Sequence, residues 1–337
     1  DNLFATIGSK GKHLAFAGHT DVVPPGNEHQ WKYPPFSAKI DGNKLYGRGS
    51  EDMKSNIACF ISATEEFISK YGSDFGGKLS FIITGDEEGE AINGTPKIMK
   101  WTKKNKINFD QCIVGEPTSN KTIGDKIKIG RRGIITFFIK VKGIQGHTAS
   151  PHRAENAAHH LTVLLNNIIS KPLDNGNKNF LASSIQIATI DIKNPVVNVI
   201  PDLANATVNI RFNDKHTSKS LIEWMQNNIN IIFDKLDKAS CTFTVRANGE
   251  SFLTKTGYLS NLMSKSIAEI TGRNSEPELA TDGGTSDARF IKDYCEVAEL
   301  GIRNQTLHKV DEFVYLSDIK ELHKIYYRII ENYFVKN

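Results

Sequence analysis

The chain has 337 residues, and its 42 basic and 38 acidic residues leave a formal net charge of +4. These charges form no polybasic block, so the balance gives no argument for a nucleic acid partner. No apolar run approaches the ~20 residues that cross a bilayer, and no signal peptide is visible at the opening residues. A chain of this length predicts two domains, without nucleic acid or membrane as a partner.

The four cysteines are widely spaced, and no two of them form a C-x-x-C pair. A cysteine-based zinc site and a disulfide framework are therefore both disfavoured. We expect buried, reduced thiols and a cytoplasmic protein. The cysteines are Cys59, Cys112, Cys241 and Cys295.

Apolar strands alternate with amphipathic helices from residue 12 to residue 118. Expected strands are 13–17, 79–84 and 111–114, and expected helices are 54–70 and 94–104. This alternation predicts a layered α/β domain. Residues 3–7 also resemble a strand, but they begin without any preceding cap or helix, so we expect a leading segment to be missing.

The pattern changes after a basic turn expected at 125–133. The next elements follow a β-α-β-β-α-β order, which is the ferredoxin-like arrangement. We therefore expect an inserted α+β domain over 133–246. Its elements are strand 134–142, helix 155–169, strands 184–192 and 204–212, helix 217–235 and strand 241–247.

The α/β pattern resumes after the insertion. Its expected elements are helix 257–271, a glycine-rich turn at 281–287, strand 295–300 and helix 317–334. The sequence thus predicts a discontinuous main domain, 1–132 with 247–337.

Acidic residues and histidines gather in five short stretches at the ends of expected elements. Each has an ordinary alternative, such as a surface loop for His19, a helix N-cap for Asp52 or a solvated turn for the acidic run. In the first stretch the period of a strand directs His19 and Asp21 the same way, which suits an imidazole oriented by a carboxylate. The stretches are Gly18-His19-Thr20-Asp21, Ser50-Glu51-Asp52, Gly85-Asp86-Glu87-Glu88-Gly89, Gly115-Glu116-Pro117 and Thr306-Leu307-His308-Lys309.

Together the stretches supply two imidazoles and at least three carboxylates. That set is too large for one zinc ion, which usually has about four ligands. It fits two metal ions that share a bridging carboxylate, with one glutamate left over to deprotonate a water molecule.

Longer motifs resemble the dinuclear zinc hydrolases of peptidase family M20. Three further segments are similar to the branch of that family that hydrolyses N-succinyl-L,L-2,6-diaminopimelate. The family motifs are G-H-T-D-V-V-P, W-x-x-P-P-F-S-A, G-R-G-x-x-D-M-K, D-E-E and G-E-P-T, and the branch segments are Ile127–Gly133, Gly143–His152 and Gly283–Phe290.

The resemblance implies a zinc-peptidase-like main domain, a mixed sheet with helices on both faces, joined to an inserted α+β dimerisation or lid domain. It also implies two Zn²⁺ ions per subunit, with Co²⁺ able to substitute. The implied metal ligands are His19 and Glu116 for one ion, Glu88 and His308 for the other, and Asp52 as the bridge.

The other implied roles concern the reaction itself. Asp21 orients His19, and Glu87 is the general base. His147, supplied by the partner subunit of a homodimer, stabilises the oxyanion. Implied substrate-binding residues are Arg131, Asn198, Arg211 and Thr285.

The chain departs from the family pattern at several positions. Ser50-Glu51 replaces small residues before Asp52, and Ser55 replaces a glycine after the D-M-K motif. Ser150 and Asp282 leave the substrate contacts open. The alternatives are another deacylase of the family, such as an acetylornithine deacetylase, and a catalytically silent binding homologue.

Overall fold

The computed structural model describes residues 1–335, which divide into two compact units. The main unit consists of residues 1–130, 253–280 and those from 286 onward, and the inserted unit of residues 131–252 with 281–285. The chain passes between the units along β8 (Gly130–Arg131) and β15 (Phe252–Leu253), which pair with each other.

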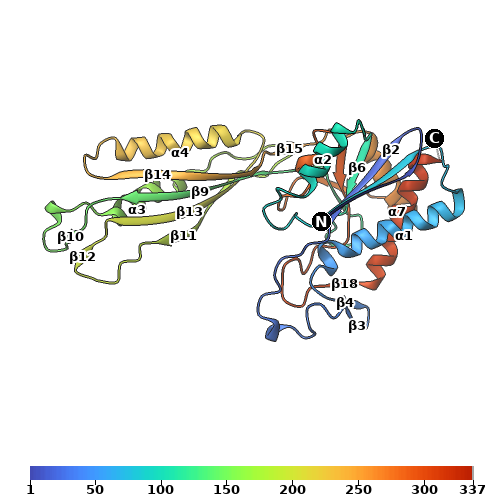
Figure 1. The fold of residues 1–337 in the computed structure, drawn as a ribbon, viewed down its shortest axis with the longest axis horizontal. Helices are drawn as coiled ribbons and strands as arrows, with labels where there is room; N and C mark the ends of the chain where they lie inside the picture. Colours follow the sequence, from blue (N-terminus) through green and yellow to red (C-terminus); the bar gives the residue numbers. More distant parts are fainter. Residues whose placement is uncertain (336–337) are drawn as a thin grey trace. The chain divides into compact units, whose positions relative to one another are not determined.

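The main unit is built on a seven-stranded mixed sheet in the order β1-β5-β2-β6-β17-β7-β16 (Figure 1). Strands β5, β2, β6 and β17 are parallel neighbours, whereas β1 pairs antiparallel with β5. The strands are β1 (Asn2–Gly8), β2 (His13–His19), β5 (Lys78–Thr84), β6 (Gln111–Val114), β7 (Lys126–Lys128), β16 (Glu278–Ala280) and β17 (Glu296–Glu299).

Helices cover both faces of this sheet, which is why every residue of β2 is buried. One face packs against α1 (Ser55–Tyr71) and α7 (Leu316–Phe334), with the rings of Phe16 and Phe60 stacked at 4.1 Å between centroids. On the other face, α2 (Thr95–Lys104) lies against β1 and β5. The remaining helices are α5 (Tyr258–Thr271), packed on α7, and α6 (Ala288–Ile291).

A second, three-stranded sheet in the main unit was not predicted. It contains β3 (Lys39–Asp41), β4 (Lys44–Tyr46) and β18 (Phe313–Tyr315). The antiparallel pairing of β18 with β4 matches Phe313 with Tyr46, so residues far apart in the chain become neighbours. It brings the segment before α1 beside the segment before α7.

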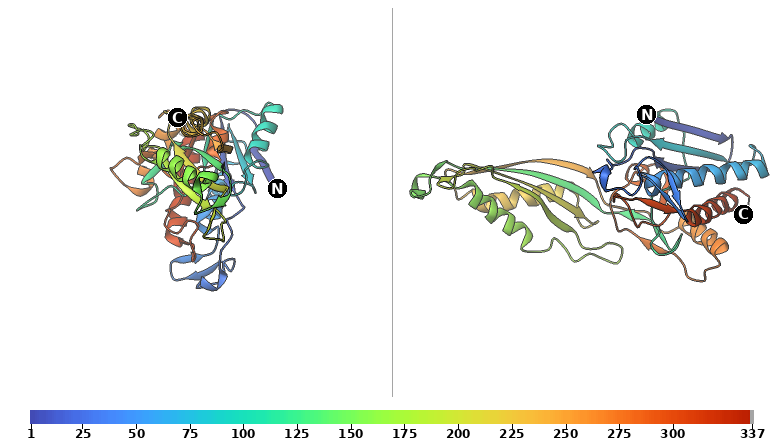
Figure 2. Two further views of the ribbon diagram at one scale, coloured as in Figure 1. Left: turned by 90° about the vertical axis from the view of Figure 1, so that its left-hand side faces the viewer. Right: turned by 90° about the horizontal axis from the view of Figure 1, so that it is seen from below.

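The inserted unit has a four-stranded antiparallel sheet in the order β11-β13-β9-β14, with both long helices on one face (Figure 2). Along the chain its main elements, β9, α3, β11, β13, α4 and β14, follow the β-α-β-β-α-β order expected from the sequence. Its elements are β9 (Gly133–Lys142), β10 (Gly146–His147), α3 (Ala157–Ile169), β11 (Ser184–Asp191), β12 (Val199–Ile200), β13 (Leu203–Phe212), α4 (Ser218–Phe233) and β14 (Ser240–Gly249).

The prediction of a basic turn at 125–133 was wrong. Residues Lys126–Lys128 form β7 of the main sheet, and Lys128 and Arg131 are buried. Two carbonyl groups accept from the Arg131 guanidinium, those of Asp282 at 3.4 Å and Gly284 at 3.1 Å. Basic side chains are compatible with buried strands here, because a charged group can be buried when it has hydrogen-bond partners inside the protein.

Among the helices that the structure describes, none combines the length and apolar character needed to cross a bilayer.

Candidate metal centre

Four of the five predicted metal ligands lie at or beyond the carboxyl ends of four adjacent parallel strands, and the fifth, Asp52, lies just before α1. His19 is the last residue of β2, Glu88 follows β5, and Glu116 follows β6. His308 lies in the segment between β17 and β18. Parallel strands bring their carboxyl ends to one edge of the sheet, which explains why distant stretches converge.

Two glycines allow the ligand-bearing segments to approach one another. A Cβ atom on Gly18 would lie 2.7 Å from the Met53 side chain, and one on Gly115 would lie 2.5 Å from the Phe16 ring. Met53 thus packs across the ends of β2 and β6 and carries its neighbour Asp52 over the sheet edge.

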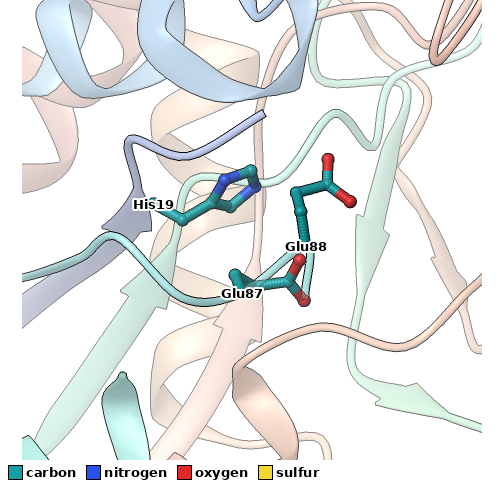
Figure 3. A group of neighbouring side chains, drawn as sticks. All are labelled: His19, Glu87 and Glu88. Atoms are coloured by element: carbon teal, nitrogen blue, oxygen red, sulfur yellow. The ribbon is translucent and has the colours of Figure 1, made fainter. Parts of the chain in front are cut away.

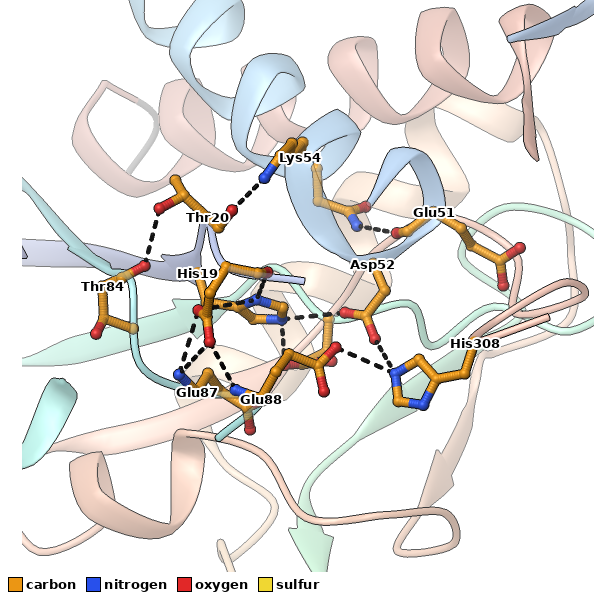
Figure 4. Close-up of polar contacts among 12 residues, drawn as sticks. His19, Thr20, Glu51, Asp52, Lys54, Thr84, Glu87, Glu88 and His308 are labelled. Carbon is orange, nitrogen blue, oxygen red and sulfur yellow. Dashed lines mark hydrogen bonds and ion pairs between the residues drawn. The ribbon is translucent and has the colours of Figure 1, made fainter. Parts of the chain in front are cut away.

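Asp52 faces both histidines (Figure 4). Its Oδ1 lies 3.1 Å from Nε2 of His19, and its Oδ2 lies 3.1 Å from Nε2 of His308. Asp52 is not the N-cap of α1, a position occupied by Lys54. The two oxygens of one buried carboxylate therefore point to two separate imidazoles.

Further carboxylates complete a group around each histidine. Glu116 lies 3.8 Å from Nε2 of His19, and Glu88 lies 3.1 Å from Nε2 of His308. The potential donor atoms of His19, Asp52 and Glu116 all lie within 4.8 Å of one another, as do those of Asp52, Glu88 and His308. The side chains of Glu87 and Glu88 also form such a group with His19 (Figure 3).

Carboxylates and imidazoles of this cluster have shifted pKa values, as expected for groups that bind cations. Burial raises the pKa of Glu116 well above its usual range, and the charges of Asp52 and Glu87 raise it further. Burial opposes the charged form of His19, yet the hydrogen bond to Asp52 and the nearby carboxylates still raise the pKa of its imidazole. The His308 pKa rises to about 10 because Asp52 and Glu88 accept from its ring. Carboxylates and imidazoles in this arrangement fit divalent metal ions.

Asp21 contacts both His19 and the loop after β5. The backbone oxygen of Asp21 lies 3.0 Å from Nδ1 of His19, and its carboxylate oxygen Oδ1 lies 3.6 Å from that nitrogen. The same carboxylate accepts from the backbone N–H groups of Glu87 at 3.0 Å and Glu88 at 2.9 Å. Asp21 therefore ties the acidic loop to the end of β2.

Glu87 has two charged neighbours that the sequence did not single out as site residues. Burial, followed by the charge of Asp287, raises the pKa of Glu87 to about 8, whereas His19 and Arg289 act in the opposite direction. The Arg289 guanidinium lies 3.6 Å from the Glu87 carboxylate. Both neighbours belong to the quoted segment 283–290, but only the fold shows which carboxylate they face.

Glu51, Glu312 and Arg48 form a second buried group beside the metal ligands. The Arg48 guanidinium donates to Glu312, and both side chains are almost completely inaccessible to solvent. Arg48 lies in the motif G-R-G-x-x-D-M-K and Glu51 is the unusual residue before Asp52, but no sequence pattern pointed to Glu312 or to the contacts among the three. Its contacts join segments more than 250 residues apart.

The predicted oxyanion and substrate residues all lie in the inserted unit. His147 is exposed on β10, and its Nδ1 accepts from the backbone N–H of Ala149 at 3.0 Å. Arg211 lies on β13, opposite Ile134 in β9 and Ser184 in β11. The roles of His147, Arg131, Asn198, Arg211 and Thr285 stay predictions.

Comparisons with known proteins agree with the resemblance seen in the sequence. The family model described as peptidase family M20/M25/M40 matches residues 15–332. A succinyl-diaminopimelate desuccinylase of Methylorubrum populi is 47% identical over 99% of this chain and 86% of its own length. The protein of the same name from Rhodopseudomonas palustris is 44% identical, with the same coverage of both chains.

Solved structures show the same fold at low sequence identity. A metallo-carboxypeptidase of family M20 from Sulfolobus solfataricus has a TM-score of 0.80 at 15% identity, with 99% of this chain and 88% of that chain covered. A dinuclear metal-binding peptidase of the family from Bacillus subtilis has a TM-score of 0.70 at 15% identity, with 100% and 86% covered. Because the family model matches residues 15–332 and a curated relative is 47% identical over 99% of the chain, the chain belongs to peptidase family M20/M25/M40.

Proposed function

We propose that this protein is a metal-dependent amide hydrolase that removes succinate from N-succinyl-L,L-2,6-diaminopimelate and releases L,L-diaminopimelate. The names of two curated relatives, at 47% and 44% identity over nearly the whole chain, support this substrate. The reaction would serve diaminopimelate and lysine biosynthesis in the cytoplasm.

One observation carries the chemistry, namely that the two oxygens of Asp52 each face the Nε2 atom of a different histidine at 3.1 Å. A bridging carboxylate of this kind would be shared by two ions. We propose Zn²⁺ for both, because histidine and carboxylate ligands suit it, with Co²⁺ as a substitute. When bound, the ions supply Lewis acidity to the amide carbonyl and lower the pKa of water.

Glu87 is the proposed general base. It takes a proton from the attacking water, the water oxygen bonds to the amide carbon, and the carbon–nitrogen bond then breaks. The same carboxyl delivers the proton to the leaving amine, so one residue serves both transfers. Its burial and the neighbouring Asp287 favour the carboxyl form that this return step requires.

Residues of the inserted unit are the proposed oxyanion and substrate contacts. Because Nδ1 of His147 accepts a hydrogen bond from Ala149, the neutral ring carries its proton on Nε2 and can donate it to an oxyanion. Arg131 and Arg211 would bind substrate carboxylates, since guanidinium groups match them in two-point geometry. Asn198 and Thr285 would add polar contacts.

We also propose a homodimer formed through the inserted unit, in which His147 of one subunit serves the site of the other. Strand β11 lies at an edge of the four-stranded sheet, where a second copy could add its own strand. Two exposed apolar side chains are Ile190 on β11 and Val197 in the loop after it. Sedimentation should show a dimer, and a monomer that retains full activity would contradict the shared site.

A substrate panel tests the proposed function. The metal-loaded protein should hydrolyse N-succinyl-L,L-2,6-diaminopimelate with a higher kcat/KM than N-acetylornithine or simple dipeptides. Faster turnover of N-acetylornithine would transfer the assignment to an acetylornithine deacetylase. Loss of turnover with a chelator and recovery with Zn²⁺ would separate the metal-dependent reaction from a contaminating activity.

A further inference from the structure

Glu51 links the turn before α1 to the loop that carries His308. It precedes the proposed bridging residue Asp52 and is only 1% exposed. Its carboxylate accepts from the backbone N–H groups of Gln305 and Thr306, both at 2.8 Å, and from the Thr306 hydroxyl. Both carboxylate oxygens are therefore engaged by the loop before His308.

Glu51 does not act as another metal ligand in this arrangement. Figure 4 shows its carboxylate directed away from that of Asp52, although the two residues are adjacent in the chain. The Glu51 carboxylate accepts hydrogen bonds from the loop before His308, and these bonds stabilise its negative charge.

Glu312 makes the reciprocal connection from the other segment. It is fully buried, and its Oε1 accepts from the backbone N–H groups of Glu51 at 2.9 Å and Asp52 at 3.2 Å. Its other oxygen accepts from Arg48, whose guanidinium also lies 3.4 Å from the backbone oxygen of His308. Each segment thus holds the backbone of the other through a buried carboxylate.

The loop needs this support more than the strand ends do. The backbone of His308 has a φ of 60°, a left-handed conformation that non-glycine residues adopt infrequently. Its side chain is 45% exposed, whereas that of His19 is 2% exposed. Side-chain packing therefore constrains the His308 ring less than the His19 ring, so the position of His308 depends more on hydrogen bonds to its backbone.

We propose that Glu51, together with Glu312, is a positioning residue that sets the separation of His308 from Asp52 and so tunes the affinity of the ion bound between them. This inference rests on the proposed two-ion site. Loss of the Glu51 carboxylate should affect one ion and not the other, because this carboxylate accepts only from Gln305 and Thr306 in the loop before His308. The Glu312 carboxylate, which accepts from the backbone N–H of the shared ligand Asp52, stays in place in such a variant.

Metal binding to Glu51→Gln provides the test. The metal-free wild type and the metal-free variant are titrated with Co²⁺. The heat of binding and the visible absorption of the bound Co²⁺ are measured during addition of the first and the second molar equivalent. We expect affinity at the site containing His308 to fall about 10-fold or more, the size typical of lost outer-shell partners. Affinity at the site containing His19 should be unchanged.

Three variants isolate the effect. Thr306→Val removes only the hydroxyl donor and should cause a smaller loss at the same site. Glu331→Gln alters another buried carboxylate, which accepts from Lys70 and Tyr71 between α7 and α1, and should leave both affinities unchanged. In a His308→Ala background, Glu51→Gln should not alter the remaining ion.

The outcomes separate this inference from the proposed function. Wild type that binds fewer than two ions rejects the two-ion site and with it the positioning role, whereas the proposed reaction is rejected by the substrate panel. A different result overturns the positioning role alone. Wild type binds two ions, and a folded Glu51→Gln variant either has wild-type metal affinity at both sites or loses affinity equally at both. If Glu51→Gln does not fold, unchanged binding in Thr306→Val overturns it instead.

Discussion

The two halves of the candidate metal centre are built in different ways. In the half around His19, the imidazole, Asp52 and Glu116 are all buried. His19 ends β2 and Glu116 follows β6, while Asp52 lies in the turn before α1. In the half around His308, the ring is exposed and lies on a loop whose backbone is held by Glu51 and Arg48. The sheet itself orders the first half, whereas side-chain to backbone hydrogen bonds order the second. We therefore expect the second ion to be the weaker and more exchangeable one.

Asp52→Ala should have the largest effect, because Asp52 is the only proposed ligand that belongs to both halves. We expect turnover to fall to background and both ions to be lost or severely weakened. Metal analysis after dialysis, combined with the turnover assay, measures both consequences. An alanine variant that retains two tightly bound ions would show that the halves do not share a bridging ligand.

Glu87→Gln should separate catalysis from metal binding. The glutamine keeps the shape of the side chain but cannot accept and return the proton, so we expect kcat to fall by about 10²–10⁴-fold. Metal content should stay at the wild-type level. Near-normal kcat would reject Glu87 as the base and direct attention to Glu88.

His19→Ala and His308→Ala should differ in metal-free stability as well as in metal binding. Loss of the buried His19 ring leaves a void and unpaired buried carboxylates, which costs about 1–3 kcal/mol by the scale for unsatisfied polar groups. Loss of the exposed His308 ring should cost less. Urea unfolding of the two metal-free variants compares them, and equal destabilisation would contradict the contrast between the halves.

Glu331 lies outside both halves of the metal centre and serves as a reference. Its replacement by glutamine should lower the unfolding free energy less than the changes above, by an amount that depends on pH. Burial acts against its ionisation, but hydrogen bonds from Tyr71 and Lys70 hold the pKa of this carboxyl at about 2. Its depressed pKa stabilises the folded state above the ordinary glutamate pKa of about 4.5, and this contribution is lost as pH falls toward about 2.

The measurement is the unfolding free energy of metal-free wild type and Glu331→Gln between neutral and acidic pH. Their difference should shrink as the solution is acidified. A difference that stays constant or grows would show that the carboxylate charge is not the stabilising feature.

The half around His19 could be predicted because its ligands are marked in the sequence. His19 and Glu116 come at the ends of apolar runs that form the buried strands β2 and β6, and parallel strands align their carboxyl ends without any need for long-range detail. Asp52 comes before the apolar helix α1, in the motif G-R-G-x-x-D-M-K. His308 was also found from its short motif. The hydrogen bonds that hold the loop of His308 were not predicted. The bond from the Thr306 backbone N–H to Glu51 joins residues 255 positions apart, and a backbone donor is present in nearly every residue type, so no sequence pattern indicates it.

Short elements were missed for a related reason. Strands β3, β4 and β18 have three residues each, too few to display an alternation of apolar and polar side chains. The basic composition of β7 masked a strand whose Lys128 is buried. Sequence patterns thus recovered the elements that build the core, while the contacts that hold the second half depend on tertiary neighbours.

Metal stoichiometry tests the central claim most directly. Wild-type protein, loaded with Zn²⁺ and dialysed, should contain two ions per chain, while His308→Ala and His19→Ala should each contain one. Wild type with one ion or none, or a His308→Ala variant that still holds two, would contradict a centre of two halves joined by Asp52.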